Sequence, residues 1–281
     1  MTKLEQQIID ASTLLSNLGL LTGKSGNLSA RKNTDQIVVT PTQKDYSTLT
    51  PNDLVIVDLR GNVIKGKLNP TSELPMHLEI YKRRPKVQAI IHTHTTYATV
   101  LAVAHSKLPA IIDESTIKLG GDISVSKYAV AGTEELAKNV AESLGTKNAS
   151  LIANHGCVTV GRNISEALEN MILLEHTAQI YVISKIFGTY HQLQQSRLYY
   201  SRLYHVGPQP YKAVFYSFDY YLSSCRVLNL GTMLMLHRTY KVHTSYSVSM
   251  IMVSNNLTLG TKTVLKLLFC LTCRSSLGDT M

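Results

Sequence analysis

A predicted β-hairpin restricts the architecture of this chain more than any other sequence feature. Residues 54–58 (LVIVD) are an apolar run that predicts a strand, and the turn residues 60–62 (RGN) lead directly into the apolar pair at 63–64. Two strands joined by such a short turn run antiparallel. Helices and strands alternate along the rest of the chain, so the pattern favours a mixed or antiparallel sheet with helices on both faces.

Helices are predicted where apolar residues recur three or four positions apart behind a capping residue. They cover residues 4–18, 72–84, 134–145 and 165–187, and the predicted caps of the last three are Ser72, Thr133 and Ser165. Short apolar runs predict strands at residues 37–40, 54–58, 63–64, 87–91 and 150–153. With 281 residues, of which 44% are hydrophobic, the chain is long enough to bury a substantial core.

The charge of the chain does not indicate a polyanionic partner. The net charge is +9 and the sequence pI is near 9.3, but the basic residues are scattered. The cluster Lys82, Arg83 and Arg84 ends a predicted helix, where cations stabilise the helix dipole. The four cysteines lack a disulfide or zinc-finger spacing, and the sequence contains neither a signal peptide nor an apolar run of roughly 18 residues. We expect a cytoplasmic protein that binds neither nucleic acid nor membranes.

Two histidines follow the predicted strand at 87–91. His92 and His94 are separated by one residue, and the two-residue period of a strand points both side chains to the same face. Two imidazoles on one face suit zinc, which binds neutral imidazole nitrogen at about 2.0–2.1 Å and keeps one position open when it is catalytic. Taken alone, the pair fits two surface or hydrogen-bonded histidines equally well.

A third histidine and a carboxylate are candidates to complete a metal site. His155 follows the predicted strand at 150–153 and precedes a glycine, as part of the segment ANHG. Glu73 lies in the first turn of a predicted helix, where the helix dipole favours a carboxylate. His77 is four residues further along the same helix face and competes for the ligand role, although a partner or core histidine is the favoured interpretation.

Two segments offer groups that bind phosphate. The loop TGKSGN supplies Ser25, Gly26 and Asn27, and the segment PTS supplies Thr71 and Ser72 at a helix N-terminus. Unpaired backbone N–H groups at such a position form an anion site.

Six short segments of the chain carry a resemblance to a known family. The chain reads SGNLS at 25–29, TPT at 40–42, PTSE at 70–73, HTHTTYA at 92–98, GGD at 120–122 and ANHG at 153–156. In this order and spacing, these segments resemble the class II (zinc-dependent) aldolase/adducin family, and within it the L-fuculose-phosphate aldolases. The resemblance covers about two thirds of the chain, from the first helix to about Gly188.

The resemblance implies a fold, a metal site and an assembly. The implied fold is a three-layer α/β/α sandwich with a central, mainly antiparallel sheet. The implied ligands of Zn²⁺ are His92, His94, His155 and Glu73, and Glu73 then serves as the catalytic base. The residues that line the phosphate pocket, by the same resemblance, are Asn27, Thr42, Thr71 and Ser72. Family members commonly form tetramers with active sites between subunits, so a homotetramer is expected.

The implied reaction is zinc-dependent cleavage of a ketose 1-phosphate, such as L-fuculose 1-phosphate, to dihydroxyacetone phosphate and a small aldehyde. Asp113 stands in the segment where the aldolases carry a catalytic tyrosine, and it is the expected acid or base on the C4 hydroxyl. Gln43 stands where the aldolases have a glycine that approaches the phosphate. Tyr204 is the candidate for a C-terminal tyrosine that reaches a neighbouring site.

Other members of the family suggest alternatives to the aldolase. A zinc-dependent epimerase or dehydratase of sugar phosphates would use the same ligands. A non-catalytic, adducin-like interaction module is a further alternative, but it has no physical reason to keep three imidazoles and a carboxylate facing one point.

The expected domain boundary lies at residue 212. Residues 1–212 form the class II aldolase/adducin-like domain by resemblance, and nothing beyond Lys212 matches the family. Residues 213–281 contain only two acidic residues and have no clear helical or strand period. A poorly structured extension is the favoured interpretation, and the alternatives are a small added domain, a frameshifted or read-through product, and a membrane-surface segment.

Overall fold

The computed structural model describes residues 2–193, 228–230, 233–243 and 246–255. The chain divides into one unit within Met1–Pro208 and a second within Gln209–Met281. The domain boundary expected at residue 212 and the candidate Tyr204 both lie outside the described residues.

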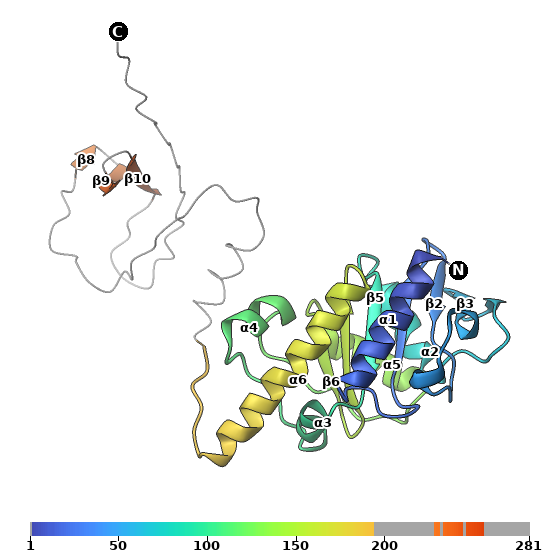
Figure 1. The fold of residues 1–281 in the computed structure, drawn as a ribbon. Coiled ribbons are helices and arrows are strands. Elements are labelled where there is room, and N and C mark those ends of the chain that lie inside the picture. Colours follow the sequence, from blue (N-terminus) through green and yellow to red (C-terminus); the bar gives the residue numbers. More distant parts are fainter. Residues whose placement is uncertain (1, 194–227, 231–232, 244–245, 256–281) are drawn as a thin grey trace, which may run out of the picture. The chain divides into compact units, whose positions relative to one another are not determined.

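A seven-stranded sheet forms the centre of the first unit (Figure 1). Its strands are β1 (Asn27–Arg31), β2 (Gln36–Val39), β3 (Val55–Asp58), β4 (Val63–Lys65), β5 (Ala89–Thr93), β6 (Ala149–Ile152) and β7 (Gly156–Gly161). They lie in the order β4-β3-β2-β1-β5-β7-β6, and every neighbouring pair is antiparallel. The predicted hairpin is confirmed as β3–β4, and so is the mainly antiparallel central sheet.

Helices cover both faces of this sheet (Figure 1). They are α1 (Lys3–Asn17), α2 (Leu74–Arg83), α3 (Thr96–Val103), α4 (Asp113–Leu119), α5 (Glu134–Leu144) and α6 (Ile164–Ile186), with the short 3-10 helices η1 (Tyr46–Thr48) and η2 (Pro51–Asp53). One apolar core joins the sheet to α1, α3, α4 and α6, and a second joins the opposite face to α2 and α5. The result is the expected three-layer α/β/α sandwich. Among the described residues, no helix has the length and apolar character needed to cross a membrane.

The two-residue period of the strands explains why both faces are apolar. In β5, Ala89 and Ile91 face the core under α6, Ile90 faces the core under α2 and α5, and all three are 0% exposed. In β7, Cys157 and Val158 divide between the two cores in the same way. The sequence of a strand that is buried on both faces is a continuous apolar run, and this pattern predicted β5.

The caps of the helices agree only in part with the prediction. Thr133 caps α5 as predicted, because its side chain accepts a hydrogen bond from a backbone amide of the first turn. The prediction that Ser72 caps α2 is wrong, since Glu73 occupies the N-cap position there. The prediction for α6 is also wrong, because Asn163 is the cap instead of Ser165.

The second unit contains a small sheet of its own. The strands β8 (Leu228–Leu230), β9 (Met233–His243) and β10 (Tyr246–Asn255) are antiparallel and lie in the order β10-β9-β8. No secondary structure was predicted for this part of the chain.

Candidate metal centre

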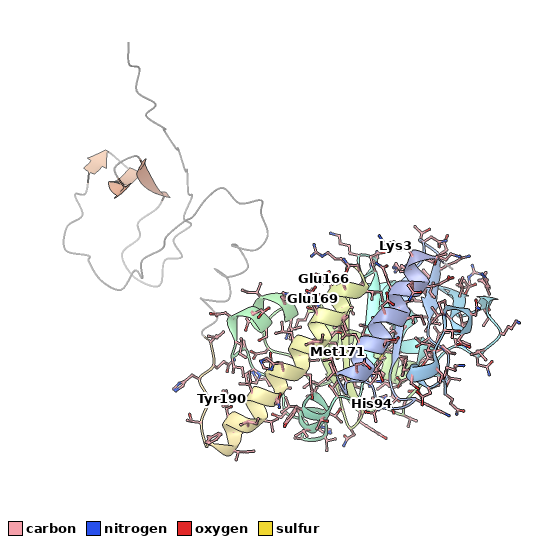
Figure 2. The ribbon with its side chains drawn as sticks, in the orientation of Figure 1. Lys3, His94, Glu166, Glu169, Met171 and Tyr190 are labelled. Atoms are coloured by element: carbon pink, nitrogen blue, oxygen red, sulfur yellow. The ribbon has the colours of Figure 1, made fainter. Side chains whose placement is uncertain are left out.

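His92 and His94 project from the end of the central strand β5. The side chain of His92 is 0% exposed, and His94 follows directly after the strand. β5 lies between β1 and β7, so that His92 pairs with Asn27 on one side and with Val158 on the other. Figure 2 shows His94 at the end of the sheet away from Lys3, which marks the start of α1.

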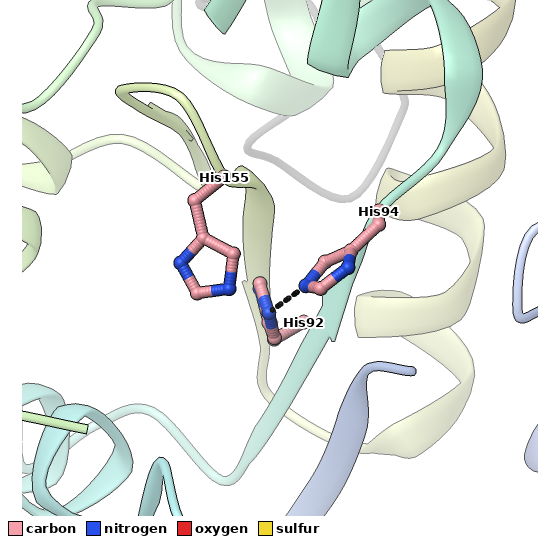
Figure 3. Close-up of side chains that lie close together, drawn as sticks. All are labelled: His92, His94 and His155. Carbon is pink, nitrogen blue, oxygen red and sulfur yellow. Dashed lines mark hydrogen bonds between the residues drawn. The ribbon is translucent and has the colours of Figure 1, made fainter. Parts of the chain in front are cut away.

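His155 comes from the turn between β6 and β7. Asn154 adopts a left-handed backbone with φ of 55°, and Gly156 begins β7. A Cβ on Gly156 would collide with the Thr93 backbone oxygen and lie 2.9 Å from the His94 ring, so the missing side chain lets this turn approach β5. The three imidazoles therefore face one another, with ring centroids 4.9, 4.8 and 4.7 Å apart (Figure 3).

The imidazoles offer lone pairs to a common point. His92 Nδ1–H donates a hydrogen bond to the Cys157 carbonyl oxygen at 2.8 Å, so its Nε2 carries the lone pair. That Nε2 lies 3.0 Å from Nε2 of His94, and the ligand atoms of His92, His94 and His155 all lie within 4.8 Å of one another. Neutral imidazole nitrogens in this arrangement are able to hold a metal ion.

Glu73 faces the same point from the N-cap of α2. Its Oε2 lies 2.9 Å from His92 Nε2, and its Oε1 lies 3.1 Å from His155 Nε2. Asn27 Nδ2 donates a further hydrogen bond to Oε2 at 2.9 Å. Burial opposes ionisation of this carboxyl, but the neighbouring imidazoles of His92 and His155 outweigh the effect of burial, so the pKa of Glu73 lies well below its usual range.

The donor set fits a tetrahedral divalent metal. Ligands bound at 2.0–2.1 Å in a tetrahedron lie roughly 3.3 Å apart. The separations from His92 Nε2 to His94 and to Glu73, and from Glu73 to His155, are 3.0, 2.9 and 3.1 Å. Three imidazole nitrogens and one carboxylate oxygen are also ligands that zinc accepts.

His77 does not belong to this set of donors. It is 0% exposed, and its ring nitrogens contact Asn27 Oδ1 at 2.5 Å and Ser29 Oγ at 2.6 Å. Its role as a buried partner, favoured over that of a ligand, is therefore confirmed. The contact of Asn27 with Glu73 was not predicted, and no sequence signal indicates it because 46 residues separate the two.

The candidate phosphate residues lie on three adjacent stretches of backbone. Thr40 N–H bonds to the carbonyl of Leu28 in β1, Thr71 N–H bonds to the carbonyl of Thr40, and Thr42 N–H bonds to the carbonyl of Asn69. This ladder brings Thr42 and Thr71 close to the start of β1, where Gly26 and Asn27 lie. Ser72 is exposed next to them.

Two further candidates have different surroundings. Asp113 is exposed at the first position of α4, and among the described residues no hydrogen bond or ion pair joins it to the three histidines. Gln43 adopts a left-handed backbone with φ of 56°, a conformation that glycine adopts more easily.

Gly26→Ala should destabilise the fold by roughly 2–4 kcal/mol. Gly26 has φ of +85°, and a Cβ there would lie 2.6 Å from both the His92 carbonyl oxygen and a methyl of Leu21. Gly23→Ala is the matched control, because Gly23 has φ of +60° but nothing within 4 Å. It should cost about 1 kcal/mol, from the left-handed backbone alone. Urea unfolding measures both, and equal losses would contradict the close approach of Gly26 to β5.

Comparisons with known proteins agree with this geometry. A family model described as the Class II Aldolase and Adducin N-terminal domain matches residues 6–182. An L-fuculose phosphate aldolase of Methanococcus maripaludis (strain C7) is 40% identical over 174 residues, which cover 62% of this chain and 93% of that protein. A 5-methylthioribulose-1-phosphate/5-deoxyribulose-1-phosphate aldolase of Rhodospirillum rubrum is 35% identical over 178 residues, 63% of this chain and 80% of that protein.

A solved structure supports the same assignment. The structure of an L-fuculose 1-phosphate aldolase superimposes with a TM-score of 0.70 at 35% identity, over 73% of this chain and 96% of that one. The chain therefore belongs to the class II aldolase and adducin family, and its named relatives place it among the enzymes of that family.

Proposed function

We propose that the protein is a zinc-dependent aldolase that cleaves a ketose 1-phosphate similar to L-fuculose 1-phosphate. The products are dihydroxyacetone phosphate and a small aldehyde. The observation that carries the proposal is the contact of Glu73 with both His92 and His155 beside a third imidazole, His94. The names of the relatives, which are aldolases of sugar phosphates, support the reaction class.

The metal of the proposal is zinc, held by His92, His94, His155 and Glu73. When bound, zinc supplies Lewis-acid stabilisation of the negative charge that develops on the carbonyl oxygen as the carbon–carbon bond breaks. The buried Nδ1–H of His92 keeps its hydrogen bond to the Cys157 carbonyl oxygen, and this bond orients the ring so that Nε2 faces the proposed metal position.

The chain's own side chains handle the protons and the phosphate. In the proposal, Glu73 exchanges the proton at C3 of dihydroxyacetone phosphate, and Asp113 exchanges the proton of the C4 hydroxyl. The backbone and hydroxyl groups around Gly26, Asn27, Thr42, Thr71 and Ser72 hold the phosphate. Tyr204 of a neighbouring subunit, a homotetrameric assembly and a cytoplasmic location stay predictions from the sequence.

The alternatives share the site and differ in the product. An epimerase would return an isomeric sugar phosphate, a dehydratase would release water, and an adducin-like module would do neither. The aldolase is favoured because Glu73 supplies the base that aldol chemistry requires, directly beside the histidine cluster.

The test is the release of dihydroxyacetone phosphate from L-fuculose 1-phosphate by the purified, zinc-loaded full chain. A coupled glycerol-3-phosphate dehydrogenase assay detects the product, and a parallel sample is treated with a chelator and then reloaded with zinc. We expect release that the chelator abolishes and zinc restores. Stoichiometric zinc without release, together with an isomerised or dehydrated sugar phosphate, would contradict the aldolase and identify one of the alternatives.

A further inference from the structure

A buried line of hydrogen bonds leads away from Glu73 into the protein. Asn27 Nδ2 donates to Glu73 Oε2 at 2.9 Å, and Asn27 Oδ1 lies 2.5 Å from His77 Nε2. His77 Nδ1 lies 2.6 Å from Ser29 Oγ, which lies 2.9 Å from the hydroxyl of Tyr81. Each of these five residues is at most 7% exposed, so water does not compete for the hydrogen bonds.

The donors and acceptors of this line have a single consistent order. The Asn27 amide directs its N–H toward the Glu73 carboxylate, so its carbonyl oxygen faces His77 and requires a donor there. His77 is therefore the Nε2–H tautomer, and its Nδ1 accepts a hydrogen bond from Ser29. Ser29 in turn accepts a hydrogen bond from the Tyr81 hydroxyl. Flipping the Asn27 amide, changing the His77 tautomer or reversing the Ser29–Tyr81 bond would each leave two acceptors facing each other.

We propose that His77 is a positioning residue that holds the Glu73 carboxylate in place through the side chain of Asn27. The proposal rests on the function proposed above, in which Glu73 is both a ligand and the proton-transfer group. The Glu73 carboxylate lies within hydrogen-bonding distance of two imidazoles and must keep one rotamer to do so. The hydrogen bond from His77 fixes the side-chain amide of Asn27, and this amide in turn holds the rotamer of Glu73.

The surroundings of His77 keep this line intact. Burial lowers the pKa of His77 to about 3, so the ring stays neutral and keeps the tautomer that donates to Asn27. The far end is also anchored, because the Arg31 guanidinium lies 4.6 Å from the centre of the Tyr81 ring and donates to the Tyr81 carbonyl at 2.7 Å. The line therefore ties α2 to β1 at the metal centre.

Two variants of His77 separate positioning from general stability. In His77→Gln, an amide N–H takes the place of Nε2–H, so the donor to Asn27 is kept. In His77→Asn, the amide oxygen still accepts the hydrogen bond from Ser29, but the side chain is too short to reach Asn27. Each variant loses one of the two buried hydrogen bonds of His77. We expect His77→Asn to lower kcat about 10–100-fold with little change in KM, and His77→Gln to keep most of the wild-type kcat.

Readouts other than turnover complete the test. Deuterium from solvent should enter dihydroxyacetone phosphate more slowly in His77→Asn than in His77→Gln, and a competing chelator should remove zinc more easily from His77→Asn. Asn170→Ala is the control for destabilisation, because Asn170 is buried in α6 and bonds to the Val160 carbonyl at 2.9 Å. It should lower the melting temperature without lowering kcat.

The outcomes distinguish the proposals. Equal kcat and equal zinc affinity in His77→Asn and His77→Gln would overturn the positioning role. If the wild-type protein binds zinc but releases no dihydroxyacetone phosphate, the proposed aldolase fails. The difference in zinc affinity between the two variants then still decides the role of His77. Should His77→Asn not fold, His77→Met replaces it, because methionine fills the space without a donor.

Discussion

Glu73→Gln should leave a protein that binds zinc but turns over about 10²–10⁴-fold more slowly. The amide oxygen of glutamine still accepts the hydrogen bond from Asn27, and three imidazoles remain to hold the metal. The amide nitrogen, however, does not accept a proton at neutral pH, so the exchange at C3 of dihydroxyacetone phosphate loses its base. Zinc content by mass spectrometry and kcat by the coupled assay measure the two effects separately.

The matched control for this variant lies on the same helix. Glu79 of α2 pairs with Arg83 at 2.6 Å on the protein surface, away from the buried contacts of Glu73. Glu79→Gln removes the same charge from α2 and should leave both zinc and turnover at the wild-type level. Full turnover in Glu73→Gln would refute the role of this carboxylate as the base, and loss of zinc would show that it is an indispensable ligand instead.

Local patterns predicted the parts of the fold that depend on neighbouring residues. The hairpin β3–β4 and the strand β5, which is buried on both faces, were predicted from apolar runs and turn residues only a few positions long. Both elements are present in the structure. Caps were less predictable, because Asn163 and Ser165 are both good cap residues, and the structure uses Asn163, whose side chain accepts a hydrogen bond from the Glu166 amide. The strand β1 was missed, although polar and apolar residues alternate in NLSAR.

The reason β1 was missed also explains what the sequence does not reveal about the site. The polar positions Asn27 and Ser29 are not on a solvent face but point into the buried line with His77. Their shared partner His77 lies on α2, 50 and 48 residues away in the chain, so only the packing of α2 against the sheet brings the three side chains together. The histidine cluster was predictable, because each of its histidines follows an apolar run whose strand ends at the same end of the sheet.

His94→Ala should abolish zinc binding and lower kcat by at least about 10²–10³-fold, the equivalent of several kcal/mol of lost stabilisation of developing charge. His94 is the ligand best suited to this test. His92 is fully buried and bonds to the Cys157 carbonyl, so its removal would also leave a buried acceptor without its donor. His94 is exposed, and its Nε2 faces the histidine cluster, so the fold should survive its truncation.

The control for His94→Ala is an exposed histidine of the same domain outside the cluster. His176 of α6 fulfils this condition, and His176→Ala should keep both zinc and activity. Circular dichroism and the melting temperature without metal should be the same for both variants, which assigns the loss in His94→Ala to the metal and not to the fold. Together with Glu73→Gln, this variant separates the two functions of the cluster, because one change removes the metal and the other removes the base beside it. Stoichiometric zinc and normal turnover in His94→Ala would contradict the site as a whole.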